Sequence, residues 1–331
     1  MNKSHPFRQW LTQTKNWIIL LLTWHSYKPS KSMPKSSSSN APVNLITGIR
    51  CKYCSSNRTV KYGSYHNIQR RYCKDCQRKF AYNDSPPHMR TPSVQIASAL
   101  GMFYEGMSLN AIRRNLFQTF SNTSSNSTIY EWILKYSKMA VEADRIYSTR
   151  KIKKSSQSLG HGPFWVTNET AIRIEGQTAW IWDVMDSWSR FLLASHLTLT
   201  RTAGDVKAVL ETAKERSGEV PGLIITDKLR TYTDGIDMAF GSDTMHVQAT
   251  GSTVHPQANY IDRFYMPFRV RSKTLKGIKK TKNATLIINS WLVYYNFLRP
   301  NIGLGNTIPA YKAEVEFPYR TWLDMVEKEY I

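Results

Sequence analysis

A chain of 331 residues is long for a single domain, so two or three domains are expected. Its hydrophobic fraction of 41% and aromatic fraction of 12% supply enough apolar material for real cores, which excludes a wholly disordered chain. The net charge of +21 excludes basic partners and favours polyanions. Residues 1–90 contain 16 Lys and Arg residues, and their only acids are Asp75 and Asp84. A solvated basic tail is the plain alternative, but so uneven a distribution favours a nucleic-acid partner.

An apolar run, "NWIILLLTW", lies near the start of the chain at residues 16–24. It is too short to cross a bilayer as a helix, which takes about 20 residues. Its length and the basic residues before it are those of a signal-peptide core, but no small-residue cleavage site follows. A start codon placed too far upstream, with Met33 as the true start, explains the run at least as well. We therefore expect residues 1–45 to be a poorly ordered extension of a cytoplasmic, nucleoid-associated protein that has no membrane partner.

All four cysteines fall within 26 residues, in the pairs "CKYC" (Cys51, Cys54) and "CKDC" (Cys73, Cys76). Two CxxC pairs that are 18 residues apart suit a tetrahedral zinc ion held by four thiolates. Two disulfides in a secreted domain are the alternative. The intervening residues predict a hairpin with strands at 59–62 and 69–72, and therefore a zinc ribbon. The basic side chains expected to face DNA phosphates are Arg58, Lys61, Arg70, Arg71, Lys74, Arg78 and Lys79.

From Pro92 to about Ser148 the apolar residues recur with a helical period and predict three helices. The predicted N-caps are Ser93, Ser108 and Thr128, and Thr128 has capping-box spacing to Glu131. The polar run "SNTSSNS" supplies the turn before the third helix. This layout is typical of a helix-turn-helix, whose second helix enters the major groove, although an ordinary helical bundle has it too. The predicted DNA contacts are Arg113 and Arg114 on the second helix and Asn126, Ser127, Thr128 and Tyr130 at the start of the third.

The pattern changes again after residue 163. Alternation over residues 164–174 predicts a strand that turns at Glu175-Gly176 into "QTAWIWDVMD", and "SRFLLASHLTL" predicts a third strand. We expect Asp186 in the turn between these two. A helix over about residues 203–216 precedes the strand "GLIITD", and a helix with Asp262 and Arg263 comes later. A meander, a helical crossover and a fourth strand are typical of the ribonuclease-H-like core, an α/β fold with a mixed sheet and flanking helices.

The predicted boundaries are 1–45 for the extension, 46–88 for the zinc ribbon, 89–150 for the helix-turn-helix domain, 151–162 for a basic linker and 163–331 for the ribonuclease-H-like domain.

Four segments resemble, in order and spacing, the catalytic domain of DDE transposases from bacterial and archaeal insertion sequences, which is shared with the integrase superfamily. They are "WVTNET", "LIITDKLRTY", "VHPQANYIDRFYMPFRVRSKTLKGIK" and "YYNFLRPNIGLGNTIPA", and they cover about residues 163–315. The aromatic helix that ends at "NFLRPN" is the most specific of them. The resemblance implies double-stranded DNA (terminal inverted repeats and target DNA) as partner, a homo-oligomer on paired ends, no small-molecule substrate, and three acids that hold two magnesium or manganese ions.

The resemblance maps the three acid positions onto Asn168, Asp227 and Asp262. Asp227 is intact, and Asp262 replaces the usual Glu but keeps its charge. Asn168 is the serious departure, because an amide oxygen can ligate a metal but brings no charge. If the hairpin turns tightly, residues whose numbers sum to 351 face one another, so Asp183 lies opposite Asn168 as a substitute ligand or only as a polar neighbour. Glu169 then points to the other face of the sheet.

A run of basic residues follows the third acid position. We interpret it as a surface for strand-end DNA, with a solvated helix face as the alternative. Its members are Arg263, Arg269, Arg271, Lys273, Lys276, Lys279, Lys280 and Lys282. His255 either contacts DNA or water near the site or is structural.

Two classes of function therefore fit the sequence. One is an active transposase that cuts and joins DNA strands with magnesium. The other is a catalytically inactive descendant that binds DNA as a repressor or architectural factor. A third interpretation, a transcription regulator fused to an unrelated α/β domain, is disfavoured by the "NFLRPN" motif.

Overall fold

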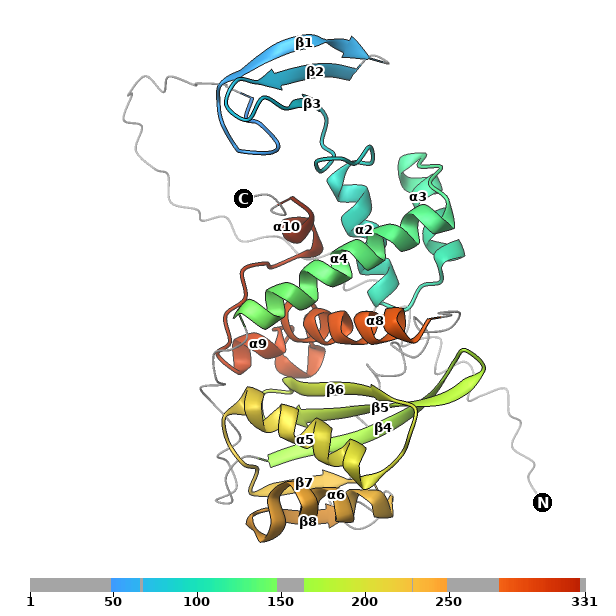
Figure 1. The fold of residues 1–331 in the computed structure, drawn as a ribbon, viewed down its shortest axis with the longest axis vertical. Helices are drawn as coiled ribbons and strands as arrows, with labels where there is room; N and C mark the ends of the chain where they lie inside the picture. The colour runs from blue at the N-terminus through green and yellow to red at the C-terminus, as the bar shows by residue number, and fades with distance from the viewer. Residues whose placement is uncertain (1–48, 66–67, 148–163, 228, 249–279, 328–331) are drawn as a thin grey trace, which may run out of the picture. The chain divides into compact units, whose positions relative to one another are not determined.

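The computed structural model describes residues 49–65, 68–147, 164–227, 229–248 and 280–327 (Figure 1). All described residues belong to one compact unit. Three predicted features lie outside the described residues: the N-terminal extension, the linker, and the segment with His255, Asp262 and the basic run as far as Lys279. Among the helices that are described, none has both the length and the apolar character of a membrane span.

A small antiparallel sheet follows the first cysteine pair, with the strand order β1-β2-β3. Its strands are β1 (Thr59–Tyr65), β2 (Ile68–Cys73) and β3 (Lys79–Ala81). The predicted hairpin is confirmed. The third strand was missed because it has three residues and too little sequence to show a period of two.

Three helices come next, namely α2 (Ser93–Tyr104), α3 (Leu109–Phe120) and α4 (Asn126–Tyr147). The predicted cap at Ser108 is confirmed, since its side chain accepts a hydrogen bond from the Ala111 N–H at 3.3 Å. The other two predicted caps are wrong. Pro92 occupies the N-cap of α2, and Ser125 caps α4, with its Oγ 3.1 Å from the Thr128 nitrogen. The polar run before α4 offers several residues that can cap a helix, and only backbone geometry distinguishes them.

A five-stranded mixed sheet with flanking helices forms the second half of the described chain, in the order β6-β5-β4-β7-β8 (Figure 1). Its elements are β4 (Phe164–Ile174), β5 (Gln177–Asp186), β6 (Leu192–Thr198), α5 (Ala203–Ser217), β7 (Leu223–Thr226), α6 (Arg230–Phe240), a 3₁₀ turn (Gly241–Asp243) and β8 (Met245–Gln248). Strands β4, β5 and β6 are antiparallel, whereas β7 runs parallel to β4 and β8 parallel to β7. The predicted α/β fold with a mixed sheet and flanking helices is confirmed, and α6 and β8 are additions to the prediction.

The β4–β5 hairpin has the tight turn that the sequence predicts. Glu175 and Gly176 both have positive φ, 54° and 78°, as a two-residue type I′ turn requires. Helix α6 covers one face of the sheet, because Trp182 meets Tyr232 with ring centroids 5.7 Å apart and Trp165 meets Phe240 at 6.0 Å. Side chains alternate along a strand, so the even-numbered residues of β4 and the odd-numbered residues of β5 face away from α6.

The C-terminal helices pack on both the sheet and the earlier helices. They are α8 (Thr281–Val293), a π-helical turn (Tyr294–Leu298), a 3₁₀ turn (Ile302–Leu304), α9 (Pro309–Lys312) and α10 (Trp322–Glu327). Helix α8 contacts both α4 and β6, and α10 contacts α2. The fully buried Tyr104 hydroxyl bonds to Ser137 on α4 at 2.7 Å and to Ser290 on α8. Burial raises the pKa of Tyr104 to about 12, so this junction keeps its proton at neutral pH.

The "NFLRPN" motif has a structural role in this fold. Asn296, fully buried, accepts a hydrogen bond from the Leu192 N–H at 2.8 Å and donates one to the Leu192 carbonyl at 2.9 Å. It therefore satisfies both backbone groups of a residue on the edge strand β6. Arg299 extends the motif to the C-terminal end of α2, where its Nε lies 3.0 Å from Oε1 of the C-cap residue Glu105.

Candidate active site and metal-binding cluster

Two of the three predicted acid positions, Asn168 and Asp227, lie just beyond the paired part of β4 and β7. Val166 on β4 lies opposite Ile225 on β7 in parallel register. Two residues further along each chain are Asn168 and Asp227, the residue that directly follows β7. The observed pairing ends at Val166 and Ile225, and continuing it by two residues predicts that Asn168 lies beside Asp227. Asp262, the third position, lies outside the described residues.

Asp183 is the cross-strand partner of Asn168, and the predicted register is confirmed. The two side chains share the face of the sheet that points away from α6. Asp183 is 4% exposed, and its Oδ1 accepts a hydrogen bond from Ser195 Oγ at 2.6 Å. Asp183 is thus one strand further from Asp227 than Asn168 is. Asp186, expected in the turn, is instead the last residue of β5 and accepts from the N–H and the hydroxyl of Ser189 at 2.8 and 2.6 Å.

The surroundings of Asp227 disfavour its charged form. Burial raises the pKa of Asp227, the N–H of Leu229 at 3.0 Å opposes the rise, and the nearby carboxylate of Glu169 adds to it. Arg201 acts in the opposite direction to Glu169. A carboxylate in such a position is stabilised by any cation that approaches it.

Glu169 forms a buried cluster on the α6 face that the sequence did not reveal. Its side chain is 3% exposed, with Oε1 paired to Arg201 and Oε2 accepting from the Tyr232 hydroxyl at 2.6 Å. The Arg201 guanidinium also lies over the ring of Trp180, 4.1 Å from its centroid. Both carboxylate oxygens therefore have partners within the fold. Tyr232 is 63 residues away in the chain, so only the tertiary structure pairs it with Glu169.

His246 on β8 is a second residue near the site that sequence reasoning missed. Its Nε2 lies 2.9 Å from Thr226 Oγ1, and that hydroxyl lies 2.7 Å from the Asp227 carbonyl oxygen. Because the hydroxyl donates to the carbonyl, Nε2 acts as the donor to Thr226. Burial lowers the pKa of His246, so the ring is neutral at physiological pH and holds the end of β7 without adding charge.

Comparison with known proteins bears directly on this domain. Residues 163–300 match the family model described as a DDE domain. This part of the chain is therefore similar to a DDE domain. A search of the curated proteins found no match.

Solved structures similar to the chain include viral integrases. The HTLV-2 integrase catalytic core domain in complex with magnesium (trimeric form) is 15% identical, with a TM-score of 0.35 over 46% of this chain and 94% of that chain. The BIV integrase catalytic core domain is 18% identical, with a TM-score of 0.34 over 45% and 91%. The simian T-cell lymphotropic virus intasome in complex with PP2A regulatory subunit B56 gamma is 12% identical, with a TM-score of 0.33 over 69% and 73%.

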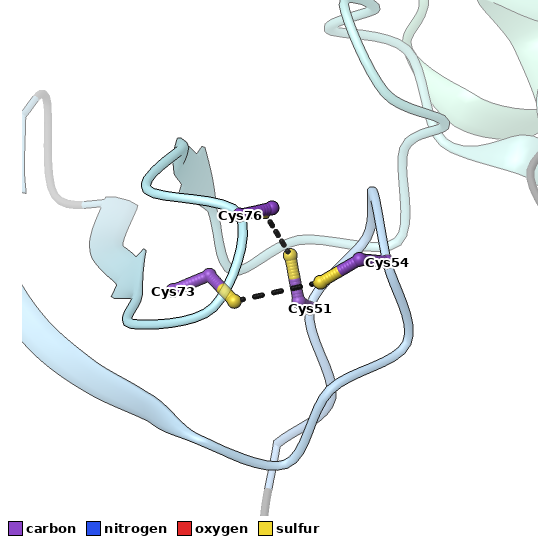
Figure 2. A group of neighbouring side chains, drawn as sticks. All are labelled: Cys51, Cys54, Cys73 and Cys76. Atoms are coloured by element: carbon purple, nitrogen blue, oxygen red, sulfur yellow. Dashed lines mark hydrogen bonds between the residues drawn. The ribbon is translucent and has the colours of Figure 1, made fainter.

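The four cysteines ahead of the DDE domain form a compact cluster (Figure 2). Their Sγ atoms all lie within 4.8 Å of one another, with Cys51 and Cys76 at 3.5 Å and Cys54 and Cys73 at 3.6 Å. All four are free thiols. A tetrahedral site with Zn–S bonds of about 2.3 Å places its sulfurs about 3.8 Å apart, so the cluster fits one such ion. Within the described part of the chain, it is the single group of three or more His, Cys, Asp or Glu residues this close together.

The two cysteine loops share a backbone geometry that also suits a metal. The residue after each CxxC pair is left-handed: Ser55 has φ 55° and Gln77 has φ 56°. The N–H of Tyr53 points to Cys51 Sγ at 3.4 Å, an arrangement that stabilises a thiolate. Without an ion, burial raises the pKa of Cys51 to about 12. Four thiolates in this space therefore need a cation to offset their charge.

The predicted DNA-contacting residues differ in their exposure and in the hydrogen bonds that they already make within the protein. Arg113 and Arg114 on α3, Ser127 on α4 and Lys79 on β3 are exposed. Thr128 and Tyr130 are half-buried, and the Tyr130 hydroxyl accepts from Asn283 on α8 at 3.1 Å. Arg71 donates to Thr59 Oγ1 at 3.1 Å and to its carbonyl at 3.2 Å, which commits that side chain to the ribbon itself. Asn126 donates to Asn110 at 2.7 Å.

Proposed function

We propose that the protein is a transposase-type recombinase that binds terminal inverted repeats and target DNA, and that it cuts and joins DNA strands with two divalent cations. The observation that supports the proposal is the parallel pairing of β4 and β7 within the DDE domain match, because the same register continued by two residues would make Asn168 and Asp227 neighbours. Asp262 is proposed as the third ligand. The ions, magnesium or manganese, supply Lewis-acid stabilisation and an activated oxygen nucleophile when bound.

The chain's own residues hold and orient the cations in this proposal. Asp227 contributes the charge, through a half-buried carboxylate on the residue that directly follows β7. Asn168 contributes a neutral oxygen. Asp183 is the proposed substitute for the missing charge, because it shares the face and the register of Asn168. Its bond to Ser195 at 2.6 Å fixes its rotamer, so a shift of Asp183 towards a cation would break that hydrogen bond.

The DNA-binding surface is proposed to include the ribbon, α3 and the start of α4. Its residues are Arg70, Lys79, Arg113, Arg114, Ser127, Thr128 and Tyr130, together with Arg263, Arg269, Arg271, Lys273 and Lys276 beyond the described residues. Arg71, also predicted as a contact, bonds to Thr59 and supports the ribbon instead. Helices α3 and α4, joined by residues 121–125, have the order of a helix-turn-helix. The four cysteines are proposed to hold a structural zinc ion. Two active sites acting on paired ends imply a homo-oligomer, located at the nucleoid where its DNA lies.

A second candidate function is DNA binding without catalysis. Three observations favour it: Asn168 lacks a charge, the carboxylate of Asp183 is engaged by Ser195, and both oxygens of Glu169 are engaged by Arg201 and Tyr232. In this case the protein acts as a repressor or architectural factor.

A nicking and strand-transfer assay with magnesium or manganese separates the two candidates. The substrate is a labelled duplex that carries the inverted repeats flanking the gene, and the proteins are wild type, Asn168→Asp and Asp227→Ala. Cutting by wild type that Asp227→Ala abolishes is the expected result for a transposase. Cutting by Asn168→Asp alone identifies an inactive descendant. Cutting that persists in Asp227→Ala would place the chemistry elsewhere.

A further inference from the structure

The zinc ribbon and the segment after it enclose a groove outside the DDE domain. Its volume is about 600 Å³, and its lining includes Tyr65, Ile68, Arg70, Ala81, Met89 and Arg90. We propose that this groove binds the sugar-phosphate backbone of DNA, with Arg70 and Arg90 on the phosphates and the apolar wall against the deoxyribose. The proposal rests on DNA being the partner in the proposed function, and it adds a specific binding site with Arg90 as a new contact.

The strand register places the ribbon side of the groove on one face of the small sheet. Arg70 on β2 lies opposite Ala81 on β3, and Tyr65 lies opposite Ile68 across the β1–β2 turn. Tyr72, two residues after Arg70, lies opposite Lys79, so the same face continues as a row of aromatic and basic side chains. The Lys79 ammonium donates to the Tyr62 hydroxyl at 2.6 Å and lies 4.1 Å from the centroid of that ring.

The opposite face of the ribbon serves its own fold. Arg71 lies opposite Phe80, which is buried together with Cys51 and Cys73. Arg71 also donates to Thr59 from this side. The adjacent residues Arg70 and Arg71 therefore have different tasks: Arg70 lines the groove, whereas Arg71 supports the sheet beside the cysteine cluster.

The second wall of the groove is held in place by hydrogen bonds. Lys52 donates to Asn83 Oδ1 at 2.6 Å and to the Ser85 carbonyl at 2.7 Å. The Ser85 hydroxyl lies 2.7 Å from Asn83 Oδ1 and 2.8 Å from the Met89 carbonyl oxygen. This wall is fixed before any ligand arrives, which reduces the entropy that a ligand must offset.

The charge of the groove selects an anionic occupant. Residues 49–90 contain ten Lys and Arg residues, and their only acids are Asp75 and Asp84. Arg70 and Arg90 both line the groove, whereas Asp75 pairs with Arg58 at the cysteine loops. Two guanidinium groups beside Ile68, Ala81 and Met89 match a polymer that alternates phosphates with apolar sugar faces. An acidic peptide offers no regular alternation of this kind, so DNA is the occupant that we infer.

Fluorescence anisotropy on the full-length, zinc-loaded chain tests the site, with a labelled 40-bp duplex of arbitrary sequence titrated across a series of salt concentrations. Arg70→Ala and Arg90→Ala are each expected to weaken binding about tenfold, because each removes a charge-assisted hydrogen bond. Each is also expected to lower the salt slope by about 0.9, the contribution of one phosphate contact. Ala81→Trp fills the groove without changing the charge and is expected to weaken binding as well. Lys214→Ala is the matched control, since it removes one exposed positive charge from α5, which does not line the groove.

Equal losses in Arg70→Ala, Arg90→Ala and Lys214→Ala, with unchanged binding by Ala81→Trp, would overturn the groove while leaving DNA binding and the proposed function intact. A full-length chain that fails to bind the duplex at low salt would overturn the proposed function together with the groove. Poly-glutamate that binds more tightly than the duplex and loses affinity in Arg90→Ala would assign the groove to an acidic peptide instead. Zinc content and circular dichroism verify the fold of each variant, and if Ala81→Trp loses its zinc, the two arginine salt slopes decide the outcome.

Discussion

Replacing Asn296 with alanine removes the side chain that closes the outer edge of the five-stranded sheet. Its two hydrogen bonds to Leu192, at 2.8 and 2.9 Å, would be lost together, and both residues are fully buried. A buried polar group that loses its partner costs about 1–3 kcal/mol. Two such groups give a loss of about 2–6 kcal/mol in the free energy of unfolding, compared with about 0.5 kcal/mol or less for an ordinary surface substitution.

Urea unfolding followed by tryptophan fluorescence measures this loss, because Trp291 lies on α8, buried and stacked on Tyr295. Hydrogen exchange locates it: the Leu192 amide is expected to exchange faster in Asn296→Ala, while amides in the β4–β5 hairpin stay protected. Asn289→Ala on α8, the helix that leads into the π-helical turn with Asn296, is the matched control, since Asn289 is half-exposed and water replaces its contacts. If Asn296→Ala changes the free energy of unfolding by less than about 0.5 kcal/mol and the Leu192 amide stays protected, Asn296 does not hold the edge strand β6.

Three further predictions concern charge and metal. Asp227→Asn is expected to be more stable than wild type at neutral pH, because the raised pKa of Asp227 means that its charged form destabilises the folded state. This difference in stability should disappear as the pH falls through the raised pKa towards 3.8. Urea unfolding at a series of pH values measures it. Glu169→Gln is expected to lower the pKa of Asp227, since the Glu169 carboxylate adds to its rise; an NMR titration of the Asp227 carboxyl measures the shift, and an unchanged pKa would contradict the electrostatic coupling. Cys51→Ser is expected to reduce bound zinc from about one ion per chain to near zero, since the four thiolates form one closed site. Metal analysis measures the content, and hydrogen exchange should show β1–β3 losing protection while β4 and β5 keep it; full zinc content in this variant would rule out the four-cysteine site.

The features that the sequence predicted well are those set by local spacing. The β4–β5 register follows from alternation along the strands and from a two-residue Glu175-Gly176 turn, so it placed Asp183 opposite Asn168 correctly. The cysteine cluster follows from two CxxC pairs on a short hairpin. Both depend on residues close together in the chain, where geometry leaves few alternatives.

The features that the sequence missed depend on distant partners or on weak local signals. The pairing of Glu169 with Tyr232 and Arg201 spans 63 and 32 residues and has no spacing rule. In the sequence, Asn296 was only part of a family motif. The structure shows that its side chain bonds to Leu192 on the edge strand β6, 104 residues earlier. Strand β8 has four residues, none of them fully buried, and so gives little apolar pattern. The cap of α4 was misplaced because neighbouring Ser and Thr residues compete for the same position.

Manganese binding at the proposed Asn168–Asp227 site is the most direct test of the proposed function. Isothermal titration calorimetry on zinc-loaded wild type, Asn168→Asp and Asn168→Asp/Asp227→Ala measures it. If Asn168 and Asp227 are neighbours that face one cation, Asn168→Asp binds manganese more tightly than wild type, and the second substitution removes the gain. A gain in affinity that survives the loss of Asp227, or no gain at all, would contradict the shared site.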